Sequence, residues 1–236
     1  MRVPTPLYST TVAGRDVQIV ATDRSDGDVH PDRVRPEDLL DRQLRSTGRR
    51  WTMLDEVHGI DLVDVDASTT LHGAVTRGVG DVAVTDRPAT HLAVWTADCA
   101  PVFLLADDGT VVGAHGGWRG LADGVLDVAV SAVRRSGGNV VGAVLGPSIG
   151  PCCYAFGADD LAAVAAGVHA HDAEIAGTTS VGERALDVPA AVQAALRHHD
   201  IELDAVGPCT GCDDRWFSHR VRNEPGRHAT VAVIGG

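Results

Sequence analysis

The sequence predicts an α+β protein with mixed sheets, folded as a single domain over residues 1–236. Short apolar strand segments and amphipathic helices follow one another without a regular β-α-β alternation, which argues against a doubly wound parallel sheet. Hydrophobic residues make up 44% and charged residues 22% of the chain, as in globular proteins that bury a core. No linker, repeat or low-complexity segment divides the chain, so one domain is expected.

The N-terminal half is predicted to consist mainly of strands. The first strand covers Asp16–Thr22, where apolar and polar residues alternate. A helix is expected over Pro36–Ser46, because it starts with proline and carries Glu37 and Asp38 near its positive end. Further strands, separated by Gly, Asp and Pro, are predicted at Trp51–Val57, Asp81–Thr85, His91–Thr96, Val102–Ala106 and Thr110–His115.

The C-terminal half is predicted to hold most of the helices. Leu121–Ser136 has one apolar stripe and ends in two arginines, which suit the negative end of a helix. Two more helices are expected at Ala158–Ala170 and Pro189–His199, the second with proline in its first turn. Val140–Leu145 and Thr230–Ile234 are short apolar runs typical of buried strands.

Composition excludes several kinds of chemistry. All 20 basic residues are arginine, so a lysine Schiff base and a P-loop lysine are impossible. Phosphate would have to be held by arginine, backbone N–H groups or a metal. The net charge of −12 argues against nucleic-acid and acidic-membrane partners. No apolar run is long enough to span a membrane, and Met1–Thr11 lacks the apolar centre of a signal peptide, so a cytoplasmic location is expected.

Three predicted strand segments end in a residue that can bind a metal, namely His58, Cys99 and His115. Two imidazoles and one thiolate form a ligand set for catalytic zinc that leaves a fourth position open, and the thiolate also suits copper(I). His115 leads into a glycine-rich run with Arg119, which can contact phosphate or a carboxylate through two N–H groups. The alternative is structural, with the histidines as polar strand caps and the cysteine packed in the core.

The other four cysteines are Cys152, Cys153, Cys209 and Cys212. Five cysteines in a chain without a secretion signal argue against a disulfide framework. Cys209 and Cys212 have the spacing of half a zinc knuckle or of a redox pair. A structural zinc would need a second chelating pair, and adjacent residues such as Cys152 and Cys153 chelate poorly. We therefore expect these four thiols to have packing roles.

Taken in order, several segments resemble one bacterial family. The matching segments are Val57-His58-Gly59, Ala97-Asp98-Cys99, the run from Ala114 to Gly120, the run from Gly146 to Tyr154, Cys209-Thr210 and Phe217-Ser218-His219-Arg220. The family was first described as laccase-domain or multicopper polyphenol oxidoreductases and later as purine nucleoside phosphorylases with adenosine deaminase activity. The resemblance covers residues 51–236, and the ordered set is far more specific than any one segment.

The resemblance implies a layered α/β/β/α fold with mixed sheets, shared with cysteine-hydrolase-like toxin domains. It places the metal ligands at His58, Cys99 and His115. The implied reaction is metal-dependent phosphorolysis of purine nucleosides (adenosine, inosine or methylthioadenosine) to free base and ribose 1-phosphate, with adenosine deaminase as a side activity. Zinc, or alternatively copper, is the expected cofactor and inorganic phosphate the co-substrate. We predict that Arg24 and Arg119 bind phosphate and that Asp98 carries a proton.

The sequence departs from the family at three places. Glu56 stands where the family usually has Gln, Gly116 where it has Ala, and Ser25–Asp28 replaces a glycine-rich segment near the substrate pocket. The closely spaced histidine pairs of a multicopper oxidase are absent at the matched positions.

Two other functions stay open. One is a metal-free thiol hydrolase, in which Cys99 attacks an amide, such as that of a cell-wall precursor, and His115 acts as its base. The other is a non-enzymatic binding protein.

Overall fold

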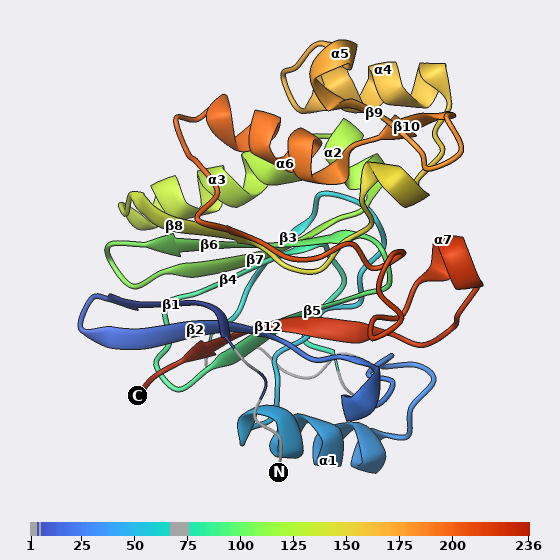
Figure 1. Cartoon of the computed structure of the whole chain (residues 1–236). Coiled ribbons are helices and arrows are strands. Elements are labelled where there is room, and N and C mark those ends of the chain that lie inside the picture. Colours follow the sequence, from blue (N-terminus) through green and yellow to red (C-terminus); the bar gives the residue numbers. More distant parts are fainter. Residues whose placement is uncertain (1–3, 5, 67–75) are drawn as a thin grey trace.

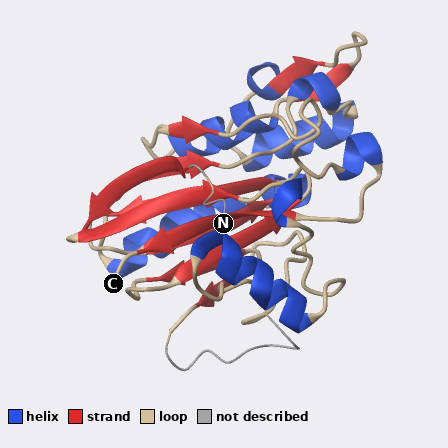
Figure 2. Ribbon diagram, turned by 60° about the horizontal axis from the view of Figure 1, so that its bottom comes forward, coloured by secondary structure: helices blue, strands red, loops and turns tan. Residues whose placement is uncertain are grey.

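Two β-sheets lie face to face between two layers of helices (Figure 1). The structure is a computed structural model that describes residues 4, 6–66 and 76–236. From the top of Figure 1 the layers are a group of helices, a six-stranded sheet, a four-stranded sheet and helix α1 (Pro36–Thr47). Figure 2 shows the same sandwich from another side. The predicted α+β class and the α/β/β/α layering are confirmed.

The six-stranded sheet is mixed and carries the strands around the candidate site. Its strand order is β11-β8-β6-β7-β4-β3. The two edge pairs, β11 with β8 and β3 with β4, are parallel, and the inner pairs are antiparallel. The strand bounds are β3 Leu62–Asp64, β4 Val82–Thr85, β6 Ala100–Ala106, β7 Val111–Gly116, β8 Val140–Leu145 and β11 Ala205–Val206.

The four-stranded sheet is antiparallel, in the order β1-β2-β12-β5. Its strands are β1 Pro6–Val12, β2 Arg15–Ala21, β5 His91–Thr96 and β12 His228–Ile234. A separate hairpin pairs β9 (Ala176–Thr178) with β10 (Arg184–Leu186). Strand β1 is not predicted from the sequence, because this edge strand carries polar, half-exposed residues instead of a clear apolar alternation.

Most helices beyond α1 gather on the outer face of the six-stranded sheet, and the last one stands beside the right-hand end of the sheets (Figure 1). They are α2 Trp118–Ala122, α3 Val125–Ser136, α4 Ala158–Gly167, α5 Asp172–Ile175, α6 Val188–Arg197 and α7 His219–Arg222. The single helix predicted over Leu121–Ser136 is wrong at its start. Gly124 adopts φ +84°, a left-handed conformation that ends α2 and lets α3 begin in a new direction.

The strand predicted over Trp51–Val57 is also wrong. Thr52 and Asp55 make only isolated bridges, one to Leu92 in β5 and the other to Val79. The segment therefore does not follow one neighbouring strand. Its apolar residues Trp51, Met53 and Leu54 are nevertheless buried, which explains why the sequence looks like a core strand.

Three apolar layers hold the sandwich together. The largest lies between the helices and the six-stranded sheet, the second between the two sheets, and the third between the four-stranded sheet and α1. Strands β5, β6 and β7 are buried along their whole length. Strands covered on both faces have continuous apolar sequences, which is how the sequence revealed them.

Within the described ranges no helix is long and apolar enough to cross a bilayer. Residues 1–3 and 5, part of the stretch used for the expected location, lie outside those ranges.

Candidate metal and substrate site

The fold brings His58, Cys99 and His115 together, and one ligand atom of each lies within 4.8 Å of the other two. The Cys99 Sγ atom is 3.8 Å from His58 Nε2. The rings of His58 and His115 are 4.8 Å apart, centroid to centroid, and stand at 77° to each other. We refer to these three side chains as the trio.

The register of β6 and β7 explains why Cys99 and His115 meet. Cys99 directly precedes β6, whose first residues Ala100 and Pro101 pair with Gly116 and His115. Neighbouring residues on paired antiparallel strands lie only about 5 Å apart. A one-residue shift in this register would turn His115 to the other face of the sheet.

Asp81 positions both histidines, although the sequence alone predicts no role for it. Its carboxylate accepts hydrogen bonds from the backbone N–H groups of His58 (2.9 Å) and Gly59 (2.7 Å) and lies 2.7 Å from His115 Nδ1. His58 itself has φ +63°, so this turn needs such support. The one sequence signal was an acidic residue at the start of a predicted strand, which many strands share.

Gly117 allows the His58 ring to pack against the start of α2. A Cβ atom at this position would lie 2.6 Å from His58 Cδ2, well inside van der Waals contact. The glycine-rich run after His115 therefore serves the close approach of the His58 side chain, in addition to any contact with a ligand.

The trio favours a thiolate at Cys99. Burial alone would raise the pKa of Cys99, but the charge of His115 and hydrogen bonds from both histidines outweigh burial and lower this pKa to about 6. Burial opposes protonation of His115, yet the charge of the Cys99 thiolate and the hydrogen bonds with Asp81 and Cys99 raise its pKa well above the ordinary value. A site that stabilises negative sulfur in this way is also suited to a cation.

Glu56 lies buried beside the trio. Its Oε1 accepts a hydrogen bond from the Trp95 backbone N–H at 3.1 Å, and its Oε2 lies 3.7 Å from His115 Nδ1. Burial raises the pKa of Glu56 to about 8. A protonated carboxyl has nearly the shape of an amide, which explains how glutamate fits where the resemblance leads one to expect glutamine.

An open cavity of about 170 Å³ adjoins the trio. Its lining includes His58, Cys99, Trp118, Arg119, Tyr154 and Arg220. The guanidinium of Arg119 lies 4.4 Å from the Trp118 ring and that of Arg220 lies 4.6 Å from the Tyr154 ring. Arg119 is the anion ligand that the sequence predicts, whereas Arg220 belongs to a segment that resembles the family but has no role predicted from the sequence.

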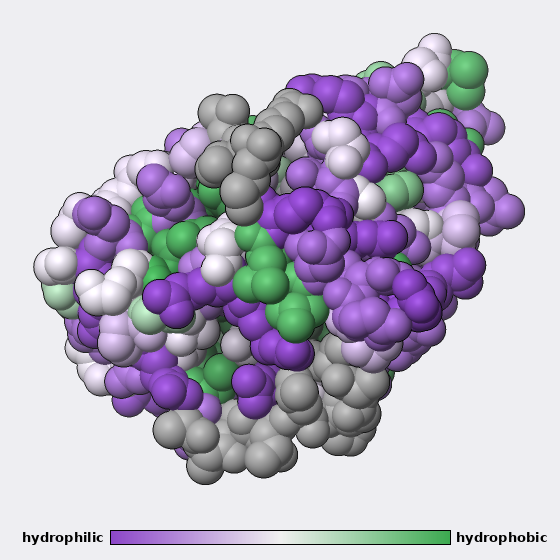
Figure 3. Space-filling view, turned by 90° about the horizontal axis from the view of Figure 1, so that it is seen from below, coloured by the Kyte–Doolittle hydropathy of each residue, from purple (hydrophilic) through white to green (hydrophobic). Residues whose placement is uncertain are grey.

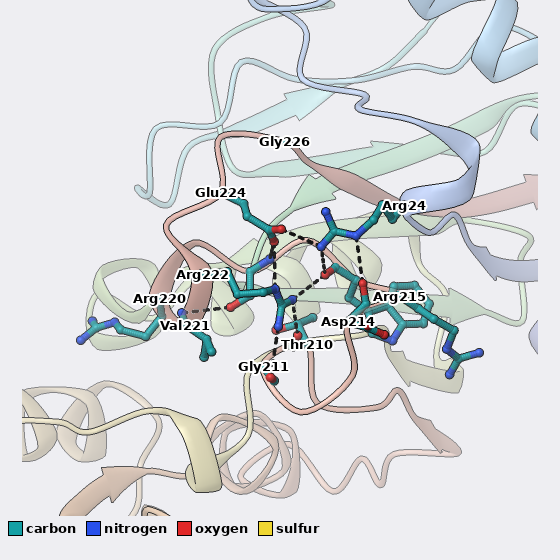
Figure 4. A network of polar contacts seen from close by, with 12 residues as sticks. Arg24, Thr210, Gly211, Asp214, Arg215, Arg220, Val221, Arg222, Glu224 and Gly226 are labelled. Carbon is teal, nitrogen blue, oxygen red and sulfur yellow. Dashed lines mark hydrogen bonds and ion pairs between the residues drawn. The ribbon is translucent and has the colours of Figure 1, made fainter.

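Arg24 lies apart from this cavity. Its guanidinium forms an ion pair with Glu224 at 2.7 Å and donates to the carbonyls of Asp214 and Trp216 (Figure 4). Arg24 lines a different hollow together with Arg222 and Glu224. The structure thus does not bring the two predicted phosphate ligands, Arg24 and Arg119, into one cavity.

Asp98 joins two loops at the edge of the cavity. It has φ +92°, and its carboxylate accepts hydrogen bonds from the Thr210 hydroxyl and from the Arg220 backbone N–H, both at 2.6 Å. These bonds hold the Arg220 backbone against Asp98, the residue before Cys99. The proton-carrying role of Asp98 stays a prediction.

The donor set fits a metal ion. Because His115 Nδ1 is held by Asp81, its Nε2 is the nitrogen left to coordinate. His58 contributes Nε2, which faces Cys99, and Cys99 contributes a stabilised thiolate. Three such ligands match zinc with one open position, and the thiolate is also compatible with copper(I).

Comparison with known proteins decides the family. A family model described as multi-copper polyphenol oxidoreductase laccase matches residues 21–235. The chain belongs to this family. The matched range extends the resemblance seen in the sequence toward the N-terminus and covers the six-stranded sheet together with strands β5 and β12 of the other sheet. In this laccase-family chain, the described residues gather two sets of side chains that could hold a metal: the trio and the four remaining cysteines.

Relatives of this laccase-family chain carry another name. A Xylella fastidiosa (strain 9a5c) protein named purine nucleoside phosphorylase is 39% identical over 190 residues, 77% of this chain and 71% of the relative. A Pseudomonas aeruginosa protein of that name is 32% identical over 206 residues, 84% of this chain and 81% of the relative.

Solved structures share the fold. The Bacillus licheniformis hypothetical protein YfiH superposes with a TM-score of 0.79 at 25% identity and 92% coverage of both chains. YlmD from Geobacillus stearothermophilus gives a TM-score of 0.75 at 24% identity, covering 95% of this chain and 93% of that one. The layered architecture of this chain is thus that of known family structures.

Proposed function

We propose that this chain catalyses the metal-dependent phosphorolysis of purine nucleosides to free base and ribose 1-phosphate. The observation that carries the proposal is the cavity, which places Arg119 and Arg220 beside the trio. The relatives named purine nucleoside phosphorylase, up to 39% identical over most of the chain, support this reaction.

Phosphate would bind at Arg119 and Arg220. The chain has no lysine, and both guanidinium groups are held against aromatic rings at the cavity wall. Guanidinium can donate two parallel hydrogen bonds to phosphate. A phosphate oxygen would then bond to the ribose C1′ as the bond from C1′ to the base breaks, and the departing base takes up a proton. By analogy with glycoside cleavage, C1′ gains positive charge on the way, which the phosphate dianion stabilises.

His58, Cys99 and His115 would hold the metal, with zinc as the first candidate and copper as the alternative. A bound zinc ion would supply Lewis-acid polarisation of the substrate. Asp81 orients His115, and Glu56 shields its buried side from water. Adenosine deaminase activity would be a second reaction of the same site, with adenosine in the same cavity.

The test combines adenosine or inosine with inorganic phosphate and metal-loaded protein, and measures ribose 1-phosphate. Arg119→Gln should raise the KM for phosphate roughly 10- to 100-fold, because a hydrogen bond to a charged group contributes about 1.5–3 kcal/mol. Arg134→Gln, at an exposed position near the end of α3, is the control and should change neither constant. Absence of ribose 1-phosphate at high concentrations of the metal-loaded protein would refute the proposal.

The metal assignment has a separate test. Cys99→Ser, His58→Ala and His115→Ala should each lose about one equivalent of metal per chain relative to the parent, since each removes one of three protein ligands. Elemental analysis gives the metal content, and circular dichroism verifies folding. His198→Ala, at an exposed position just after α6, should keep the parent's metal. Full occupancy in Cys99→Ser would show that the trio is not the binding site.

A thiol hydrolase remains the second candidate because Cys99 Sγ lies 3.8 Å from His58 Nε2 and within 4.8 Å of a His115 ring nitrogen. A nucleophilic thiol with an adjacent imidazole base can cleave an amide. Two results together would favour this activity: amide hydrolysis that resists chelators, and its loss on iodoacetamide labelling of Cys99 alone. Phosphorolysis that is lost on chelation and restored by zinc would exclude it.

A further inference from the structure

The four cysteines outside the trio form a second cluster. Cys152 and Cys153 belong to a 3-10 turn, Pro151–Cys153, that follows β8. Cys209 and Cys212 lie in the loop after β11. All four sulfur atoms lie within 4.8 Å of one another, and all four cysteines are free thiols in the structure.

Backbone pairing brings these two segments together. Ser148 and Cys209 form an isolated parallel bridge, and the Thr210 N–H donates to the Ser148 carbonyl at 3.0 Å. The 3-10 turn then lets both adjacent cysteines reach the facing loop. Adjacent cysteines chelate poorly in an extended chain, but Cys152 and Cys153 lie in a 3-10 turn. The reason for expecting these thiols to have only packing roles therefore does not hold.

The sulfur separations are close to those of a tetrathiolate metal site. Cys152 Sγ lies 3.6 Å from Cys209 Sγ and 3.0 Å from Cys212 Sγ, and Cys153 Sγ lies 3.5 Å from Cys212 Sγ. A regular tetrahedron with metal–sulfur bonds of about 2.3 Å has sulfur–sulfur edges of about 3.8 Å. A small expansion of the cluster would therefore accommodate a zinc ion. All four cysteines are free thiols in the structure, so each sulfur is available as a ligand.

The Cys209 sulfur has a backbone donor beside it. It accepts a hydrogen bond from the Gly150 N–H across the cluster at 3.1 Å. Such donors stabilise a thiolate. Gly211 also packs directly on Cys153, since a Cβ atom at Gly211 would lie 2.8 Å from the Cys153 sulfur. The loop is thus shaped to close over four sulfur atoms.

We propose that Cys152, Cys153, Cys209 and Cys212 bind a structural zinc ion, separate from the metal of the trio. Four thiolates would repel one another in this volume, and a divalent cation offsets that repulsion. Four protein ligands leave no open position for substrate, so the site stabilises the fold and takes no direct part in catalysis. The proposal does not depend on the reaction assigned to the trio.

This zinc would fix one wall of the candidate cavity. Thr210, between Cys209 and Cys212, donates its hydroxyl hydrogen to Asp98, which directly precedes Cys99. From the other side, Arg222 donates to the Thr210 and Gly211 carbonyls at 3.0 and 3.2 Å (Figure 4). The loop is therefore held between the proposed zinc and the Arg222 guanidinium. Because Thr210 lies in this loop, its hydrogen bond fixes the position of the Asp98 side chain.

The experiment measures zinc per chain by elemental analysis after purification under reducing conditions with excess zinc. The parent should hold two equivalents, His58→Ala one and Cys153→Ser one. X-ray absorption on His58→Ala, which keeps the cluster intact, should show four sulfur ligands at about 2.3 Å. This measurement needs no change in the cluster, so it still decides the question if Cys153→Ser does not fold.

Two results would overturn the proposal. One is a parent with a single zinc that is lost completely in His58→Ala, with five reactive thiols after unfolding. The other is only three or one reactive thiols after unfolding without reductant, because those counts show one or two disulfides. Loss of one zinc equivalent from Cys153→Ser, with the other equivalent kept at the trio, would support the structural site.

Discussion

One carboxylate, that of Asp81, positions both imidazoles of the trio. It accepts backbone hydrogen bonds around His58 and holds His115 Nδ1. Burial opposes its ionisation, but the hydrogen bonds from His115 and from this backbone outweigh burial and keep the pKa of Asp81 below its ordinary value. A charged acceptor on a ligand histidine fixes the ring and makes it a better ligand.

Asp81→Asn should therefore weaken metal binding at the trio about 10- to 100-fold while the protein stays folded. The amide has nearly the same shape but carries no charge and accepts fewer hydrogen bonds. Competition with a chromophoric zinc chelator measures the affinity. Asp86→Asn, at an exposed position just after β4, is the matched control. Equal affinities of Asp81→Asn and the parent would show that Asp81 has no positioning role.

Glu56→Gln should change little. The carboxyl of Glu56 is buried and its pKa is raised to about 8 by burial, so at neutral pH it is largely protonated and already resembles an amide. We expect metal content and kcat/KM within about twofold of the parent at pH 7, because the hydrogen bond from the Trp95 N–H is kept. A tenfold loss of activity at this pH would mean that an ionised Glu56 is required.

At the scale of elements, strand β6 connects the site to the core. Its start pairs with the His115 end of β7, and its middle contributes Phe103 to the apolar layer between the sheets. Gly113 in β7 lies against this ring, since a Cβ atom there would lie 3.0 Å from Phe103 Cε1. The register that brings the trio together thus rests on packing between the sheets.

Phe103→Ala should lower the free energy of unfolding by about 3–5 kcal/mol, because it leaves a cavity in a close-packed layer. Val141→Ala in β8 is the control: this side chain is 51% exposed, so its truncation should cost under about 0.5 kcal/mol. Urea unfolding followed by circular dichroism measures both values. Similar losses in the two variants would contradict the assignment of Phe103 to the core.

At the scale of the whole molecule, charge and layering act together. The net charge is −12, and the face of the molecule seen from below is largely hydrophilic (Figure 3). Inside the sandwich, burial keeps some titratable groups neutral. Burial lowers the pKa of His228 in β12 to about 3, and burial together with Arg49 lowers that of His91 in β5 to about 4.

His228 should make stability depend on pH. Its pKa is lower in the folded state than in the unfolded state, where it is about 6.5, so the unfolded chain binds more protons below that value. Stability is then lost as pH falls from about 6.5 toward 3, and His228 accounts for about 2 kcal/mol of the loss between pH 7 and 5. Urea unfolding of the parent and of His228→Gln at the two pH values measures this difference.

The matched control is His198→Gln, which alters an exposed histidine after α6 and should leave the parent's pH dependence unchanged. His91 keeps its own contribution in every variant, so only part of the acid sensitivity should disappear in His228→Gln. An equal loss of stability in the parent and His228→Gln would show that His228 is not the group that titrates.

The sequence by itself determined the fold class, the buried strands and the three trio residues. Strands β5 and β8 and the start of α1 lie where the sequence predicts them, because continuous apolar runs and a proline at a helix start are local signals. The trio was visible because each member ends an apolar segment. These signals depend on neighbours along the chain, which a sequence displays directly.

Tertiary structure alone decided which distant groups meet. Asp81 and Arg220 join the candidate site through contacts across strands and loops. Arg24, which like Arg119 was predicted to bind phosphate, pairs with Glu224 outside that cavity. The break between α2 and α3 depends on the backbone angle of one glycine. The four-cysteine cluster forms because Ser148 pairs with Cys209, an interaction between segments about 60 residues apart that leaves no periodic pattern in the sequence.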